Sequence, residues 1–104
     1  MFSATLTEER TSEVVIRLEG ELDLATTPDL AAVVGGALAS GAPRIVLDAA
    51  RLEFADSTGL AGIARLSKQA SDQGSALVLC NCNELTAKVL ALTGLDTLVE
   101  VLAG

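Results

Sequence analysis

The chain has 104 residues, half of them hydrophobic, and a formal net charge of −7. This length fits one domain, residues 1–104, and the hydrophobic content is enough for a core without metals or disulfides. The 14 acidic residues outweigh seven scattered basic ones, so binding to nucleic acid or to an anionic membrane surface is not expected. Trp and Tyr are absent, which leaves almost no aromatic platform for stacking bases or sugars.

Targeting and membrane segments are not expected either. The first six residues lack the basic region and apolar run of a secretory signal. No uncharged apolar stretch is long enough to span a bilayer. The expected protein is cytoplasmic and makes no membrane insertion.

Two strands joined as a hairpin are expected first. Residues 2–6 alternate apolar and polar side chains, which is typical of a half-exposed strand. Residues 13–19 behave in the same way, with Val14, Ile16 and Leu18 on the inner face. The polar residues 8–12 between them suit the connection of a hairpin.

A first helix is predicted to begin at Thr27-Pro28-Asp29, with Thr27 as the cap and Pro28 at the first helical position. The apolar residues that follow recur at helical spacing on one face: Leu30, Val33, Val34, Ala37 and Leu38. Gly41 is expected to end this helix.

Unbroken apolar runs predict two further strands, one over residues 45–47 ending at Asp48 and one over 76–80. Such runs favour strands covered on both faces, in a mixed or parallel sheet with helices packed on it. On a strand, Cys80 and Cys82 would point to the same face. Both are expected to be free thiols, and a zinc site is not expected because the chain has no histidine.

Two more helices and a last strand complete the expected order. One helix begins near Ser57, and its inner face is formed by Leu60, Ile63, Ala64, Ser67 and Ala70. The next covers residues 83–93, with the inner stripe Leu85, Val89 and Leu92, and Gly94 takes the left-handed position after it. A last short strand is expected over residues 98–102. The order β-β-α-β-α-β-α-β predicts an α/β fold with a small mixed sheet.

The most unusual segment opens the second helix, after a strand and a short polar connection: Asp56-Ser57-Thr58-Gly59-Leu60. In the simplest interpretation, Asp56 or Ser57 caps that helix. A serine hydrolase lacks support, because there is no histidine and no Gly-x-Ser-x-Gly elbow. The Asp-Thr-Gly or Asp-Ser-Gly signature of aspartic proteases does not match, and their all-β fold contradicts the helical periodicities. We therefore expect no enzyme.

A phosphoacceptor is the remaining chemical interpretation of Ser57. A phosphate adds about −1.5 to −2 charges, and a helix N-terminus favours an anion by about 0.3–1 kcal/mol. The fold should therefore tolerate the modification. An acidic partner surface would reject it, because like charges at an interface cost several kcal/mol, and Asp23 and Asp56 would add to that repulsion.

Over essentially its whole length the sequence resembles stand-alone STAS domains of the bacterial anti-sigma-factor antagonist family. The resemblance rests above all on Asp56-Ser57-Thr58-Gly59-Leu60 at the expected distance after a strand. Further matching segments are Gly20-Glu21-Leu22-Asp23, Ile45-Val46-Leu47-Asp48, Gly74 and Leu92-Thr93-Gly94-Leu95. It implies the STAS fold.

The resemblance also implies a partner-switching role. In similar proteins an anti-sigma factor that is itself a serine kinase phosphorylates the serine at the Ser57 position. The unphosphorylated antagonist binds that kinase and frees the sigma factor, and a PP2C-type phosphatase restores this form. The Mg-ATP would belong to the kinase, so no cofactor of the chain itself is implied.

The resemblance assigns roles residue by residue. Ser57 matches the acceptor, with Thr58 as an alternative because many members have a second serine there. Asp23, Asp56, Thr58, Gly59 and Leu60 match residues near the switch that bind the partner. Two other roles stay open: a STAS subunit of a lipid-transport ABC complex, and a nucleotide-binding STAS module, although no Gly-x-x-x-x-Gly-Lys-Ser/Thr loop is present.

Overall fold

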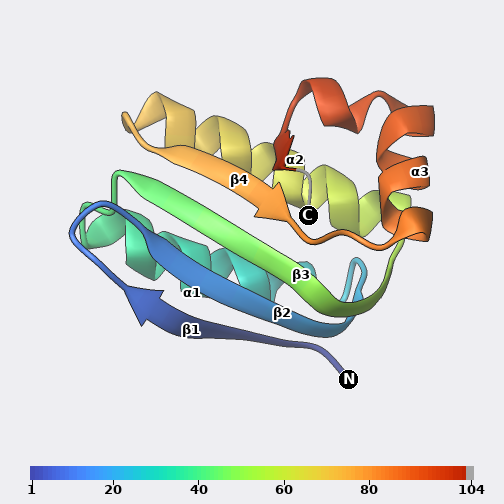
Figure 1. Ribbon diagram of the computed structural model, residues 1–104, viewed down its shortest axis with the longest axis horizontal. Coiled ribbons are helices and arrows are strands. Elements are labelled where there is room, and N and C mark those ends of the chain that lie inside the picture. The colour runs from blue at the N-terminus through green and yellow to red at the C-terminus, as the bar shows by residue number, and fades with distance from the viewer. Residues whose placement is uncertain (103–104) are drawn as a thin grey trace.

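The computed structural model describes residues 1–102 and contains a five-stranded mixed sheet in the order β1-β2-β3-β4-β5 (Figure 1). The strands β2, β3, β4 and β5 run parallel to one another, and β1 runs antiparallel to β2. The predicted element order and α/β class are confirmed. The elements are β1 Ser3–Glu9, β2 Val14–Leu22, α1 Thr27–Ala39, β3 Arg44–Ala55, α2 Ser57–Asp72, β4 Ala76–Cys80, α3 Glu84–Thr93, the 3₁₀ turn η1 Leu95–Thr97, and β5 Glu100–Leu102.

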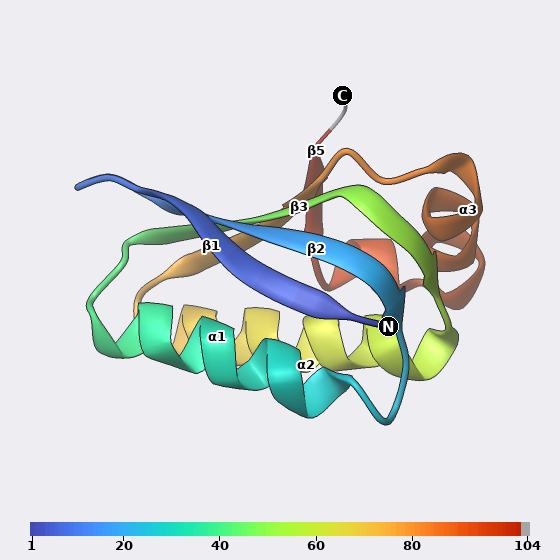
Figure 2. The ribbon, with the colours of Figure 1, turned by 90° about the horizontal axis from the view of Figure 1, so that it is seen from below.

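Two helices cover one face of the sheet. Figure 2 shows α1 and α2 side by side beneath it, with α3 at the end where β3 finishes. The core lies between this helical layer and the sheet, and the predicted inward residues Val14, Ile16 and Leu18 of β2 belong to it. The predicted inner faces of α1 and α2 are also confirmed, since Leu30, Val34, Leu60 and Ile63 are fully buried.

The central strands are buried on both faces, as expected, but α1 and α2 cover only one of these faces (Figure 2). Val46 and Val78 are buried, yet they lie outside the core cluster. They alternate with core residues and are therefore on the face opposite α1 and α2. In the register of the sheet Val15 pairs with Val46, and Val46 with Val78. An apolar row across three strands thus explains the unbroken hydrophobic runs without a second helical layer.

Strand β3 is much longer than predicted. It runs without a polar connection from Arg44 to Ala55, directly before the helix that carries Ser57. Its second half pairs with residues 19–22 of β2, across two register shifts. This stretch is therefore a strand because its backbone pairs with β2, and a local pattern of apolar residues does not reveal such pairing.

The start of α1 differs by one residue from the prediction. Thr26 takes the N-cap position and Thr27 is the first helical residue, with Pro28 following it. The side chain of Thr26 makes no cap hydrogen bond to the helix. It turns back toward Asp23 instead, accepting a hydrogen bond from the Asp23 amide at 2.9 Å.

The inner stripe predicted for α3 is wrong at two of its three residues, since only Val89 packs against the core. Leu85 and Leu92 are exposed, and the buried residues of this helix are Thr86 and Leu90. The side chain of Asn83 sets this orientation: its oxygen accepts from the Thr86 amide at 2.8 Å, and its amide nitrogen lies 3.4 Å from the Leu52 carbonyl oxygen on β3. The helix is thereby anchored through its Thr86 side.

The two cysteines do not share a strand face. Strand β4 ends at Cys80, because Asn81 adopts a left-handed backbone with φ of 61°. Both thiols are free and only partly exposed. Burial raises the pKa of both, and the Asp48 carboxylate contributes further to the raised pKa of Cys80. The neutral thiol is therefore favoured at physiological pH.

Asp48 links the middle of β3 to the end of β4. Its Oδ1 accepts hydrogen bonds from the Asn81 side chain at 2.9 Å and from the Ala50 amide at 3.0 Å. The bond from Asn81 is the main cause that lowers the pKa of Asp48. Burial opposes it, whereas the Ala50 amide, Arg17 and Arg51 reinforce it.

This linkage predicts an acid-sensitive contribution to stability. A folded-state pKa below the unfolded one stabilises the fold above the unfolded pKa, and the contribution disappears as pH falls through the folded pKa. Asp48→Asn should therefore lose less stability than the wild type between pH 7 and pH 3. Asn81→Gly, which removes the donor and suits the positive φ, should do the same. Urea midpoints at both pH values measure this, and parallel losses in all three proteins would contradict it.

Candidate functional site

The site is built where the carboxyl ends of β2 and β3 lie side by side. Leu22 and Ala55 are paired in the register of these parallel strands, so Asp23 and Asp56 leave the sheet at the same edge. The Asp56 amide donates a hydrogen bond to the Leu22 carbonyl oxygen at 3.2 Å. The structure thus brings together two segments that lie more than thirty residues apart in the sequence.

Asp56 is the cap of α2. It has extended backbone angles, and its Oδ1 accepts a hydrogen bond from the Gly59 amide at 2.7 Å. The sequence left open whether Asp56 or Ser57 fills this position, and the structure places Asp56 there. Capping therefore does not explain the presence of Ser57.

Ser57 and Thr58 are the first two residues of α2, and both are exposed. Within residues 1–102, neither hydroxyl makes a hydrogen bond. The amides of these two residues belong to the first turn, where no helical carbonyl oxygen is available to accept from them. The two exposed hydroxyls thus lie at the positive end of the α2 dipole.

Gly59 and Leu60 are buried and offer no side chain to the surface. Leu60 is part of the core. A Cβ on Gly59 would lie 2.5 Å from the Leu22 carbonyl oxygen, which is closer than such atoms approach in proteins. These residues seat the first turn of α2 directly on the end of β2 and so fix where Ser57 is presented.

Asp23 lies at the same edge but is engaged by its own loop. Its Oδ1 accepts a hydrogen bond from the Thr26 amide at 3.1 Å, and its backbone oxygen accepts from the Thr27 amide at 3.0 Å. The carboxylate is partly buried. Asp23 is thus joined to the start of α1, while Asp56 is joined to the start of α2.

Two exposed apolar side chains flank these acids, and sequence reasoning missed both. Leu24 follows Asp23 and is 70% exposed, and Phe54, two residues before Asp56, is 45% exposed. Their exposure could have been suspected from the sequence, because one is a large apolar residue in a turn and the other is on the outer side of a strand. Together with Ser57 and Thr58 they give this edge both apolar and polar groups.

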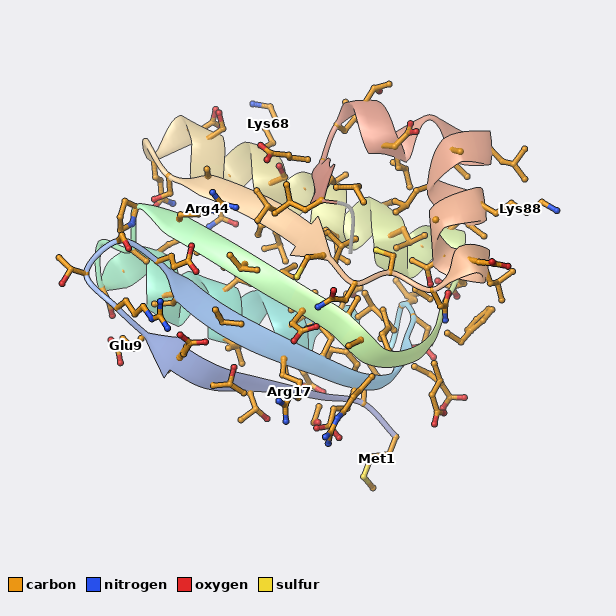
Figure 3. All side chains as sticks on the ribbon, viewed as in Figure 1. Met1, Glu9, Arg17, Arg44, Lys68 and Lys88 are labelled. Carbon is orange, nitrogen blue, oxygen red and sulfur yellow. The ribbon has the colours of Figure 1, made fainter. Side chains whose placement is uncertain are left out.

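Basic residues are not concentrated at this edge. Figure 3 shows Arg17 and Arg44 on the sheet, Lys68 on α2 and Lys88 on α3, spread over different parts of the molecule. Lys68 pairs with Asp72 at 3.1 Å, and Arg44 lies 3.7 Å from Glu13. No group of three or more metal-binding side chains occurs among residues 1–102. In the same part of the chain, every helix is too short or too polar to cross a membrane.

Comparison with protein families gives one match over most of the chain. The model of a family described as "Mlab, STAS domain" matches residues 5–100. These residues include the ends of β2 and β3 and the whole of α2.

Several solved structures with the same fold are anti-sigma factor antagonists. An antagonist from Mycobacterium paratuberculosis is 25% identical, with a TM-score of 0.83 over 97% of this chain and 85% of that one. Unphosphorylated SpoIIAA is 24% identical, with a TM-score of 0.80 over 98% of this chain and 88% of that one. Phosphorylated SpoIIAA, a Bacillus cell fate determinant, is 25% identical, with a TM-score of 0.73 over 98% of this chain and 91% of that one.

Proposed function

This chain belongs to the STAS domain family, and we propose that it acts as an anti-sigma-factor antagonist switched by phosphorylation of Ser57. Structural similarity to anti-sigma factor antagonists supports the general role. One solved relative has a phosphorylated and an unphosphorylated form. In our proposal the unphosphorylated chain binds an anti-sigma factor that is a serine kinase, and the sigma factor is released.

The observation that carries this proposal is that Asp56, and not Ser57, caps α2. The Ser57 hydroxyl is therefore not needed as a cap, and it is exposed. A kinase needs an accessible hydroxyl. Thr58 is equally exposed, and it remains the alternative acceptor.

The proposed switch acts through charge at an interface. A phosphate on Ser57 adds about −1.5 to −2 charges at the end of α2 whose first-turn amides favour anions. We therefore expect the protein to stay folded when Ser57 is phosphorylated. Before phosphorylation the surface around Ser57 presents apolar and polar groups to the partner. After phosphorylation this surface is strongly negative, and the Asp56 carboxylate beside Ser57 adds to the charge that repels the partner.

The partners and the setting complete the proposal. The kinase supplies the Mg-ATP, and a PP2C-type phosphatase removes the phosphate. The chain itself is one STAS domain, residues 1–104, that carries out no catalysis, binds no nucleic acid and works in the cytoplasm.

Phosphorylation by the partner tests the acceptor. Incubation of the wild-type chain with its anti-sigma factor kinase and Mg-ATP should raise the intact mass by one phosphate. Ser57→Ala should abolish this change, and Thr58→Val should keep it. A phosphate that persists in Ser57→Ala and disappears in Thr58→Val would move the switch to Thr58.

Two other outcomes would replace the proposal. Purification of the chain with an ABC ATPase, and with no sigma-pathway protein, would indicate a subunit of a lipid-transport complex. A rise in the melting temperature on addition of GTP or ATP alone would indicate a nucleotide-binding module. The antagonist role predicts neither result.

A further inference from the structure

The N-cap of α1 is occupied by a threonine that does not cap. Threonine at this position normally accepts a hydrogen bond from an amide in the first turn of its helix. Thr26 makes no such bond. Its hydroxyl makes hydrogen bonds to other groups, and these groups lie next to the Ser57 site.

Thr26 and Asp23 hold each other through reciprocal hydrogen bonds. The Asp23 amide donates to Thr26 Oγ1 at 2.9 Å, and the Thr26 amide donates to Asp23 Oδ1 at 3.1 Å. The Thr26 hydroxyl proton can be donated to Asp23 Oδ1 at 3.1 Å or to the Glu21 carbonyl oxygen at 3.2 Å. We call residues 23–26, closed in this way, the 23–26 clasp.

The clasp uses only one oxygen of the Asp23 carboxylate. Within residues 1–102, the Thr26 amide and the Thr26 hydroxyl donate to this carboxylate, and both bonds go to Oδ1. Oδ2 is thus available to a group outside the clasp. The closed turn also leaves Leu24 at its tip, and the Leu24 carbonyl oxygen accepts from the Thr27 hydroxyl at 3.2 Å.

The clasp rests against α2 on both of its sides. Before it, the Leu22 carbonyl oxygen contacts Gly59 and accepts from the Asp56 amide. After it, the Thr27 methyl group lies so close to α2 that a Cβ on Gly62 would be 2.8 Å from it. The position of the clasp relative to the Ser57 helix is therefore fixed by a backbone contact before it and by a side-chain contact after it.

We propose that Thr26 is a positioning residue of the switch, whose hydroxyl closes the 23–26 clasp and fixes the Asp23 carboxylate and Leu24 at the edge that carries Ser57. This inference rests on the proposed function, because it gives the clasp a part in recognition of the anti-sigma factor kinase. Thr26 touches no reacting atom and acts through Asp23 and Leu24.

The test compares Thr26→Val, which removes the hydroxyl at similar volume, with Thr26→Ser, which keeps it. Amide hydrogen exchange by NMR reports the clasp directly. The Asp23 amide should exchange at least tenfold faster in Thr26→Val and close to the wild-type rate in Thr26→Ser. The Gly59 amide, held by Asp56, should be unchanged in both variants and serves as the internal reference.

Affinity for the anti-sigma factor kinase that binds the wild type is the second measurement. Thr26→Val should bind at least tenfold more weakly, and Thr26→Ser should restore binding to within about threefold. Thr93→Val is the matched control, because its hydroxyl donates to the Val89 carbonyl oxygen within α3, away from the clasp. It should bind as the wild type does.

The outcomes separate this inference from the proposed function. Equal binding by wild type and Thr26→Val, with a faster Asp23 amide, would overturn the positioning role and leave the proposed function intact. An unchanged Asp23 amide in Thr26→Val would overturn the clasp itself. A wild-type chain that binds no anti-sigma factor kinase would overturn the proposed function, and the recognition role of Thr26 with it.

Discussion

Replacing Leu60 by alanine should lower the free energy of unfolding by about 2–5 kcal/mol. Leu60 is fully buried in the first turn of α2 and belongs to the core between the helices and the sheet. The truncation removes apolar contacts and leaves a cavity that the rigid seat of Gly59 on β2 cannot close. Because the total stability of a small domain is about 5–15 kcal/mol, the loss is a large share of it.

Leu92→Ala is the matched control for this prediction. Leu92 is also on a helix, but it is 76% exposed, so its truncation should change stability by no more than about 0.5 kcal/mol. Urea unfolding followed by far-ultraviolet circular dichroism measures both variants, since the chain has neither Trp nor Tyr for a fluorescence signal. Similar losses in the two variants would contradict the assignment of Leu60 to the core.

Replacing Ser57 by aspartate should weaken binding to the anti-sigma factor kinase at least tenfold, which corresponds to about 1.4 kcal/mol. The new carboxylate lies at the first helical position of α2, where it is exposed and next to Asp56. Repulsion from an acidic partner group, or loss of solvation at the interface, weakens the complex. Ser57→Ala should bind as the wild type does, and calorimetric titration compares the three proteins.

Ser71→Asp controls for the added charge. It introduces the same carboxylate at an exposed position near the other end of α2. Binding close to the wild-type affinity would show that the position of the charge matters and not the net charge of the chain. If Ser71→Asp and Ser57→Asp were equally weak, a local switch at Ser57 would be excluded.

Local sequence patterns predicted most of the elements because each pattern has a direct physical cause. Alternation placed Val14, Ile16 and Leu18 of β2 in the core. Helical spacing identified the buried faces of α1 and α2. Gly94 takes the predicted left-handed backbone, with φ of 75°.

The errors arise where contacts distant in sequence decide the structure. The second half of β3 is a strand because it pairs with β2. The rotation of α3 depends on Asn83 reaching β3, which an apolar periodicity within the helix does not reveal. Thr26, and not Thr27, precedes α1, and it exchanges hydrogen bonds with Asp23 and not with the helix.

The candidate site was predictable in part. The motif around Ser57 marked the start of a helix, but which residue caps it could be decided only from the Asp56 contact with Gly59. The neighbouring position of Asp23 depends on the pairing of Leu22 with Ala55. Leu24 and Phe54 were missed, because exposure of an apolar side chain depends on the whole fold.

The most direct measurement compares the chain phosphorylated at Ser57 with the unmodified chain, in both partner affinity and thermal unfolding. The proposed switch predicts that affinity for the anti-sigma factor kinase falls at least tenfold while the melting temperature stays within a few degrees, because α2 tolerates an anion at its N-terminus. Unchanged affinity would contradict the switch. A lost affinity accompanied by a large fall in melting temperature would contradict its action through charge at an interface.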